Sequence, residues 1–116
     1  MAFTNASKEA AAAAVVAGTN QYISLHTGDP GTTGTNEASG GSPTYARKST
    51  TWTAGASDGS ITGSQVTFDV PTGTYTHMGI WSAVSGGTFV GGFALSSSAA
   101  LGAQGQVLVT PTVTVS

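Results

Sequence analysis

The sequence predicts a mainly β protein, an antiparallel β-sandwich of jelly-roll-like character with one short N-terminal α-helix. After residue 20, short segments of alternating apolar and polar residues follow one another, separated by clusters of glycine and serine. This is the pattern of antiparallel strands joined by turns. Helical periodicity appears only near the N-terminus. Because 116 residues are enough for one core but not for two, we expect a single domain, 1–116.

Residues 4–18 carry the signals of a helix. Three side chains could cap its N-terminus: Thr4, Asn5 and Ser7. Glu9 follows in the first turn, five alanines favour propagation, and Gly18 can end the helix. The helix is alanine on nearly every side, so by itself it buries little surface. We therefore expect it, together with the 28–47 loop, to contact neighbouring proteins.

The strands follow from alternation. Ile23 and Leu25 share one face of their segment, and Val66, Phe68 and Val70 share a face of another. Both faces of TYTHMGIW are substantially apolar, as expected of a central or interface strand. We expect strands in QYISLHT, around 47–52, and in QVTFDV, TYTHMGIW, GTFVGGFAL and QVLVTPTVTVS. Pro111 has no amide proton, so the last strand should lie at an edge or be bulged there.

The segment 28–47 is a long glycine-rich loop that begins at Asp-Pro-Gly. An aspartate side chain can bond the turn backbone, proline fixes φ, and glycine permits a positive φ. Arg47 could bridge to Asp29 or to Glu37 and so order the loop. The residues to which we assign a structural role in or beside this loop are His26, Asp29, Pro30, Gly31, Glu37 and Arg47.

Composition excludes several classes of function. Only 7% of residues are charged, against roughly 25% in ordinary globular proteins, which favours association over a free monomer. Three basic residues cannot neutralise the phosphates on which nucleic-acid affinity rests. The chain has no cysteine, and its alanine run is too short and too weakly apolar for a membrane span or a signal peptide. We expect a soluble protein that binds neither nucleic acid nor membrane.

No motif for catalysis or metal binding is present. His26 and His77 could approach each other if their strands pair, but the spacing typical of metal ligands is missing. Ser24 and His26, with Asp29 or Asp69, supply the residue types of a hydrolase triad without a GxSxG turn. The glycine clusters match neither phosphate-binding fingerprint. We therefore expect no enzyme, no catalytic residue, no metal and no cofactor, and we interpret both histidines as structural.

Aromatic residues can fill a core, make subunit contacts or bind carbohydrate. Packing and subunit contact is the favoured interpretation, and carbohydrate binding remains the alternative. The interface candidates are Tyr45, Lys48, Trp52, Tyr75, His77 and Trp81.

The order of motifs LHTGDPG, EASGG, YAR and THMGIWSAVSGG, over residues 20–116, resembles a family of small tailed-bacteriophage virion proteins labelled tail-fibre or minor tail proteins. The resemblance leaves the alanine-rich helix outside. It implies a structural protein made in the host cytoplasm and located in the virion, an accessory tail subunit that mediates assembly contacts. Its implied partners are further copies of itself and other virion proteins. Two alternatives remain: a capsid decoration or cement protein of the head, and a carbohydrate-binding module that binds a host-surface glycan.

Overall fold

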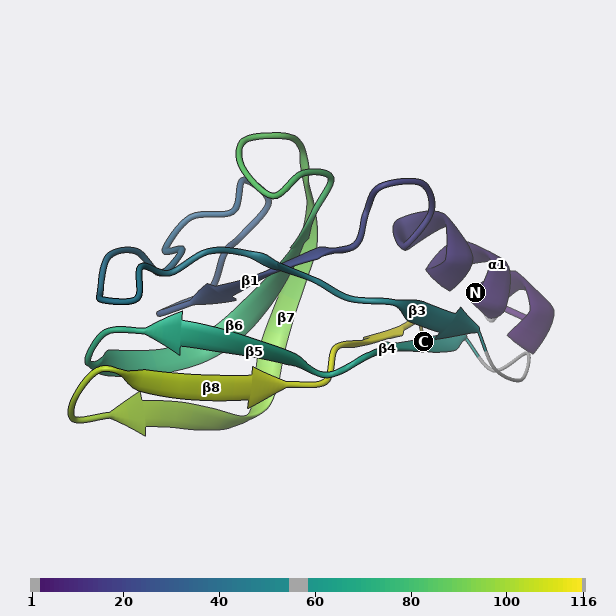
Figure 1. Cartoon of the computed structure of the whole chain (residues 1–116). Helices are drawn as coiled ribbons and strands as arrows, with labels where there is room; N and C mark the ends of the chain where they lie inside the picture. Colours follow the sequence, from purple (N-terminus) through teal and green to yellow (C-terminus); the bar gives the residue numbers. More distant parts are fainter. Residues whose placement is uncertain (1–2, 55–58, 116) are drawn as a thin grey trace.

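A computed structural model describes residues 3–54 and 59–115. In this part of the chain, one helix precedes a series of antiparallel strands (Figure 1). The elements are α1 (Asn5–Val15), β1 (Tyr22–His26), β2 (Lys48–Ser49), β3 (Trp52–Ala54), β4 (Ser60–Gly63), β5 (Val66–Val70), β6 (Gly73–Trp81), β7 (Phe89–Leu101), β8 (Gly105–Val109) and β9 (Thr112–Thr114). The prediction of a mainly β, antiparallel protein with one short helix is confirmed.

The strands form three sheets. A four-stranded sheet has the order β2-β1-β6-β7, a three-stranded sheet has the order β3-β4-β9, and β5 and β8 form a two-stranded ribbon. Figure 1 shows α1 beside β3, β4 and β9 at one end of the molecule, with the four-stranded sheet and the ribbon at the other. The central position of β6 is confirmed, because it pairs with β1 on one side and with β7 on the other.

The three sheets and the helix share one hydrophobic core. Its buried members come from β1, β4, β5, β6, β8, β9, α1 and the 27–47 loop. The alternation in β5 is confirmed, since Val66, Phe68 and Val70 are all buried and the residues between them are not. Strand β1 is buried on both faces from Ile23 to His26, because the 27–47 loop covers the face that carries Ser24 and His26.

Three regions differ from the predicted strands. The segment expected as one strand around 47–52 contains β2 and the start of β3, which belong to different sheets. The expected last strand divides at Pro111 into β8 and β9, which belong to different sheets. Pro111 cannot donate a backbone hydrogen bond, but its carbonyl oxygen accepts one from Gly63 N at 2.8 Å. Strand β4 was missed because its sequence, SITG, has only one large apolar residue, Ile61.

The helix packs on its own domain but buries little of itself, as expected, because Ala12 is the only one of its residues that is buried. Thr4 Oγ1 caps it by accepting a hydrogen bond from Ser7 N at 3.1 Å, and Ala12 is completely buried. Glu9 lies beyond the first turn, where its carboxylate accepts a hydrogen bond from Gly59 N at 3.2 Å. Helix α1 therefore covers the three-stranded sheet and is part of the fold.

Candidate functional site

The loop between β1 and β2 begins with a tight turn. Asp29 Oδ1 accepts a hydrogen bond from Gly31 N at 2.8 Å, and Gly31 has a φ of 61°. Pro30 is buried, and its carbonyl oxygen accepts hydrogen bonds from Gly34 N at 3.0 Å and Thr35 N at 3.1 Å. The first part of the loop is thus a compact hydrogen-bonded unit that ends beside the four-stranded sheet.

Arg47, at the end of the loop, binds the middle of the loop and the turn that precedes β7. Its guanidinium contacts both carboxylate oxygens of Glu37, with Nε to Oε2 at 2.9 Å and Nη2 to Oε1 at 3.0 Å. Its Nη1 donates to the carbonyl oxygens of Ala83 at 3.1 Å and Gly86 at 2.8 Å. Of the two acidic partners that the sequence offered, Arg47 therefore binds Glu37.

Tyr45 adds a second donor to Glu37. Its hydroxyl donates to Glu37 Oε2 at 2.8 Å and accepts from Leu25 N at 3.0 Å. Burial, followed by the nearby Glu37 carboxylate, raises the pKa of Tyr45, so the phenol remains a donor. Burial alone would raise the pKa of Glu37, but the hydrogen bonds from Arg47 and Tyr45 outweigh burial and hold that pKa below its ordinary value.

Trp81 connects this ion pair to the buried face of β1. The Arg47 guanidinium carbon lies 3.6 Å from the centroid of the Trp81 ring, which is a cation–π contact. Phe89 packs on the indole edge-to-face with centroids 5.1 Å apart. Trp81 Nε1 donates to Ser24 Oγ at 2.9 Å. A Cβ at Gly34 would overlap the indole, so only glycine fits there.

The hydrogen bonds of His26 determine its tautomer. Nδ1 lies 2.7 Å from Thr35 O, which can only accept, so Nδ1 carries the proton. In the neutral ring Nε2 then accepts from Ser24 Oγ, at 2.7 Å. Desolvation by burial lowers the pKa of His26 and so favours the neutral ring. The hydrogen bond to Thr35 has the opposite effect on this pKa but is outweighed. The chain of donors therefore runs from Trp81 through Ser24 to His26 and on to the loop backbone.

This arrangement fixes the loop and offers no reactive group to solvent. Ser24 and His26 have the residue types of a hydrolase pair, but both are 0% exposed. Asp29 is used in the turn, and Asp69 accepts from Gln106 Nε2 at 3.3 Å. Within residues 3–54 and 59–115 no buried side-chain polar atom lacks a hydrogen-bond partner.

Metal ligands do not gather in the described part of the chain. His26 and His77 are paired residues of β1 and β6, but no third histidine or carboxylate completes a group that could hold an ion among the described residues. His77 Nδ1 instead lies 2.8 Å from Thr76 Oγ1. The described residues also include no helix with the length and hydropathy needed to cross a membrane.

The interface candidates fall into two groups. Tyr75 and Trp81 are only 2% and 9% exposed, so of the two roles that the sequence analysis grouped together, packing and subunit contact, they serve packing in the chain's own core. Trp52 is half-buried and donates from Nε1 to Asn20 O at 2.9 Å. Three further candidates are also half-buried: Tyr45, Lys48 and His77.

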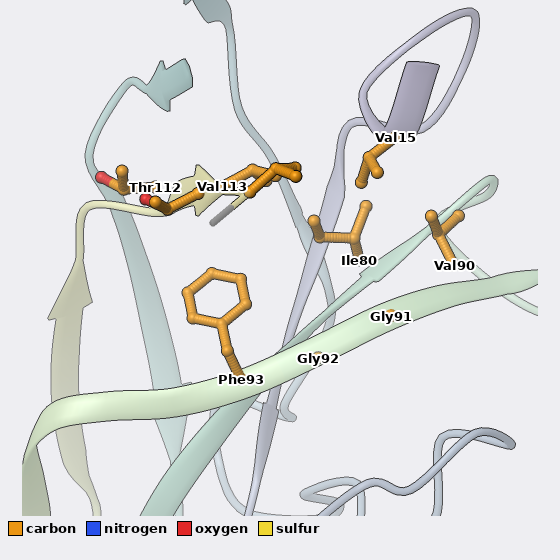
Figure 2. Close-up of a pocket in the computed structure, with 10 residues that line it drawn as sticks. Val15, Ile80, Val90, Gly91, Gly92, Phe93, Thr112 and Val113 are labelled. Carbon is orange, nitrogen blue, oxygen red and sulfur yellow. The ribbon is translucent and has the colours of Figure 1, made fainter. Parts of the chain in front are cut away.

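A second feature is an apolar groove that the sequence analysis did not identify. Its volume is about 430 Å³, and it lies between β7, β9, β6 and the C-terminal end of α1 (Figure 2). Figure 2 shows Phe93 and Val113 on one side of the groove and Val15, Ile80 and Val90 on the other, with Gly91 and Gly92 on the β7 backbone. A further hollow of about 430 Å³ continues between β7 and β8. The signal in the sequence was the glycine pair among the apolar residues of FVGGFAL, the first half of β7.

Comparison with known proteins gives one result. Residues 4–115 match the model of a family described as podophage GP4 fiber I protein gp80. The match includes the N-terminal helix, which the motif resemblance had left outside. A search of curated proteins finds no match.

Proposed function

Because the chain belongs to the family of podophage GP4 fiber I protein gp80, we propose that it is an accessory structural subunit of a tailed-phage fibre. It makes assembly contacts with copies of itself and with other virion proteins. The observation that carries this proposal is the family match over nearly the whole chain.

The contacts of the loop support a structural role. Hydrogen bonds join Trp81 to Ser24 and Ser24 to His26, Arg47 packs on the Trp81 ring, and the Ser24 hydroxyl is closed off from solvent. A loop held by so many internal bonds keeps one shape, which suits a surface that has to fit a neighbour in a particle. Of the described aromatic residues only Phe3 is exposed, so carbohydrate binding gains no support from an open aromatic surface.

Labelling of intact particles tests the proposal. Gold-conjugated antibodies raised against the purified chain should bind the fibres when particles are imaged by electron microscopy. Label on the head would overturn the fibre assignment in favour of a capsid decoration protein. An absence of label from particles whose other virion proteins are detected would overturn a role in the virion. Particles incubated with antibody to a known head protein provide the control for accessibility.

A further inference from the structure

Strand β7 is a long strand that the described part of the chain leaves poorly covered. It is the longest described strand, with 13 residues, yet none of them is buried. It pairs with β6 on one side only, and within residues 3–54 and 59–115 no strand pairs with its other side. An edge strand presents a row of unpaired backbone N–H and C=O groups, which can template pairing with another chain.

The edge of β7 lacks the charges and prolines that usually block such pairing. No Asp, Glu, Lys or Arg follows Asp69 in the sequence, and β7 contains no proline. Bulges occur in its pairing with β6 between Ile80 and Trp81 and between Tyr75 and His77. Between them β7 is regular from Gly91 to Ala94. The bulges therefore restrict any added pairing to a short stretch with a defined register.

No contact within the described part of its own chain explains why residue 91 is a glycine. Glycine in a strand interior costs stability, and it often marks a place where another backbone approaches closely. The neighbouring Gly92 is required internally, because a Cβ there would lie 2.5 Å from Pro30 Cγ and 2.8 Å from Met78 O. A Cβ at Gly91 would meet nothing within 4 Å, and it would point into open space at the groove.

From these observations we infer that the β7 edge, with the groove beside Gly91, is the surface on which a second copy of this chain docks through its own β7. The inference deepens the proposed function, because it names a contact between copies of the subunit.

The choice of occupant follows from charge and length. A charged peptide finds no opposite charge on this surface, whereas two uncharged edges do not repel each other. Of the other strands at sheet edges in the described part, β2, β3 and β9 have three residues or fewer, which is too short to cover Gly91–Ala94. The same stretch of a second copy has the same length and the same lack of charge, so we take β7 of another copy as the occupant.

Antiparallel self-pairing about a two-fold axis at Gly92 would use the groove. In that register Gly91 of each copy lies opposite Phe93 of the other, so the ring of Phe93 can cover the glycine and enter the adjacent space. The same surface patch serves both copies, as a two-fold interface requires. The contact then closes on itself as a dimer.

Matched charge variants of the full chain test this inference. Gly91→Lys places a cation at the centre of the proposed contact, and Gly102→Lys adds the same charge at a glycine outside the strand. An added Cβ meets nothing within 4 Å at either position, so both variants should fold. Sedimentation equilibrium at micromolar concentrations should show a dimer of twice 11.4 kDa for the wild type and for Gly102→Lys. The association constant of Gly91→Lys should be lower by about tenfold or more.

Several outcomes would overturn the β7 dimer. They are a monomeric wild type, a wild type that forms species larger than a dimer, and a Gly91→Lys protein that associates as strongly as the wild type. If Gly91→Lys fails to fold, Ala94→Lys, at an exposed residue of the same strand, replaces it with the same expected loss. Association is measured on the purified chain, whereas the fibre location is measured on particles. A chain that does not dimerise would leave the fibre assignment unchanged, and particles without label on their fibres would leave the dimer measurable.

Discussion

At the scale of single residues, the hydrogen bonds of the buried His26 ring restrict its protonation state. Its two ring nitrogens bond Ser24 Oγ and Thr35 O, both at 2.7 Å, while the ring is completely buried. A second proton would make Nε2 a donor toward Ser24 Oγ, which already accepts from Trp81 Nε1. Ser24 would have to accept twice and would lose its own acceptor. The geometry and the lowered pKa of His26 therefore both favour the neutral ring.

We expect the chain to lose stability on mild acidification because of His26. The folded-state pKa lies below the ordinary value of 6.5, so the unfolded chain takes up a proton first. The contribution of His26 to stability is complete above about pH 6.5 and is lost as the pH falls toward the lower folded-state pKa. Glu37, whose pKa is also lowered, adds a loss in the same direction, but only below its ordinary value of 4.5.

The test is the melting temperature at a series of pH values between neutral and about pH 5, where Glu37 contributes little. At neutral pH, His26→Asn should lower the free energy of unfolding by about 1–3 kcal/mol, because Ser24 and Thr35 lose their hydrogen bonds to the imidazole ring. Its melting temperature should therefore be lower than that of the wild type. Its melting temperature should also change less with pH. His77→Asn, at the half-buried residue opposite His26 on β6, reports the contribution of the other histidine. A pH dependence in His26→Asn as steep as that of the wild type would contradict the assignment.

At the scale of elements, the 27–47 loop is the segment whose conformation depends most on contacts distant in sequence. Its inner side lies on the Trp81 ring at Gly34, and Arg47 joins it to the turn before β7. The loop therefore acts as a fixed cover over β1 and β6. Strand β1 can be buried on both faces only because this cover is present.

A pair of glycine substitutions measures how tightly the loop fits against the sheet. Gly31 and Gly34 both have positive φ, 61° and 79°, so alanine is strained to a similar degree at each. An added Cβ at Gly31 meets nothing within 4 Å, whereas at Gly34 it overlaps the Trp81 ring. We expect Gly34→Ala to destabilise the chain by about 1–3 kcal/mol more than Gly31→Ala in chemical denaturation, because the indole cannot move without breaking its bond to Ser24. Equal losses for the two variants would show that the loop is loosely packed there.

The elements that the sequence revealed are those with strong local patterns. Val66, Phe68 and Val70 alternate, and the apolar residues on both faces of β6 indicated a central strand. The Asp-Pro-Gly turn was readable because its hydrogen bond joins residues two apart. Strand β4 escaped because four residues with one large apolar side chain carry almost no periodic signal.

The contacts of the site required long-range information. Arg47 could be paired with either of two carboxylates from the sequence, and only the fold brings Glu37 to it. The bond from Trp81 to Ser24 joins residues 57 positions apart, and no local pattern predicts it. The groove likewise forms between β7 and β9, which belong to separate sheets. These features depend on which segments distant in sequence pack together in the folded chain, and short-range sequence patterns do not reveal that.

At the scale of the whole molecule, charge is distributed very unevenly. All eight charged side chains lie between Lys8 and Asp69, and the residues that follow carry none. Strands β6, β7, β8 and β9 all belong to the uncharged part. The molecule thus has two kinds of candidate contact surface: the uncharged β7 edge, and the loop region with Asp29, Glu37, Arg47 and Lys48 that the sequence analysis had favoured.

The salt dependence of self-association distinguishes these two surfaces. Contacts between exposed charges weaken as ionic strength rises, because the screening length falls from about 14 Å at 0.05 M to about 4 Å at 0.5 M. Pairing of uncharged edges consists of backbone hydrogen bonds and apolar contacts, which screening hardly affects. We expect the dimer association constant of the full chain to change by less than about threefold over this range of NaCl. Lys48→Gln, which removes one of the charges of the loop region, should associate like the wild type at both concentrations. A steep loss of association with salt, or a clear effect of Lys48→Gln, would place the contact on the charged loop region and away from β7.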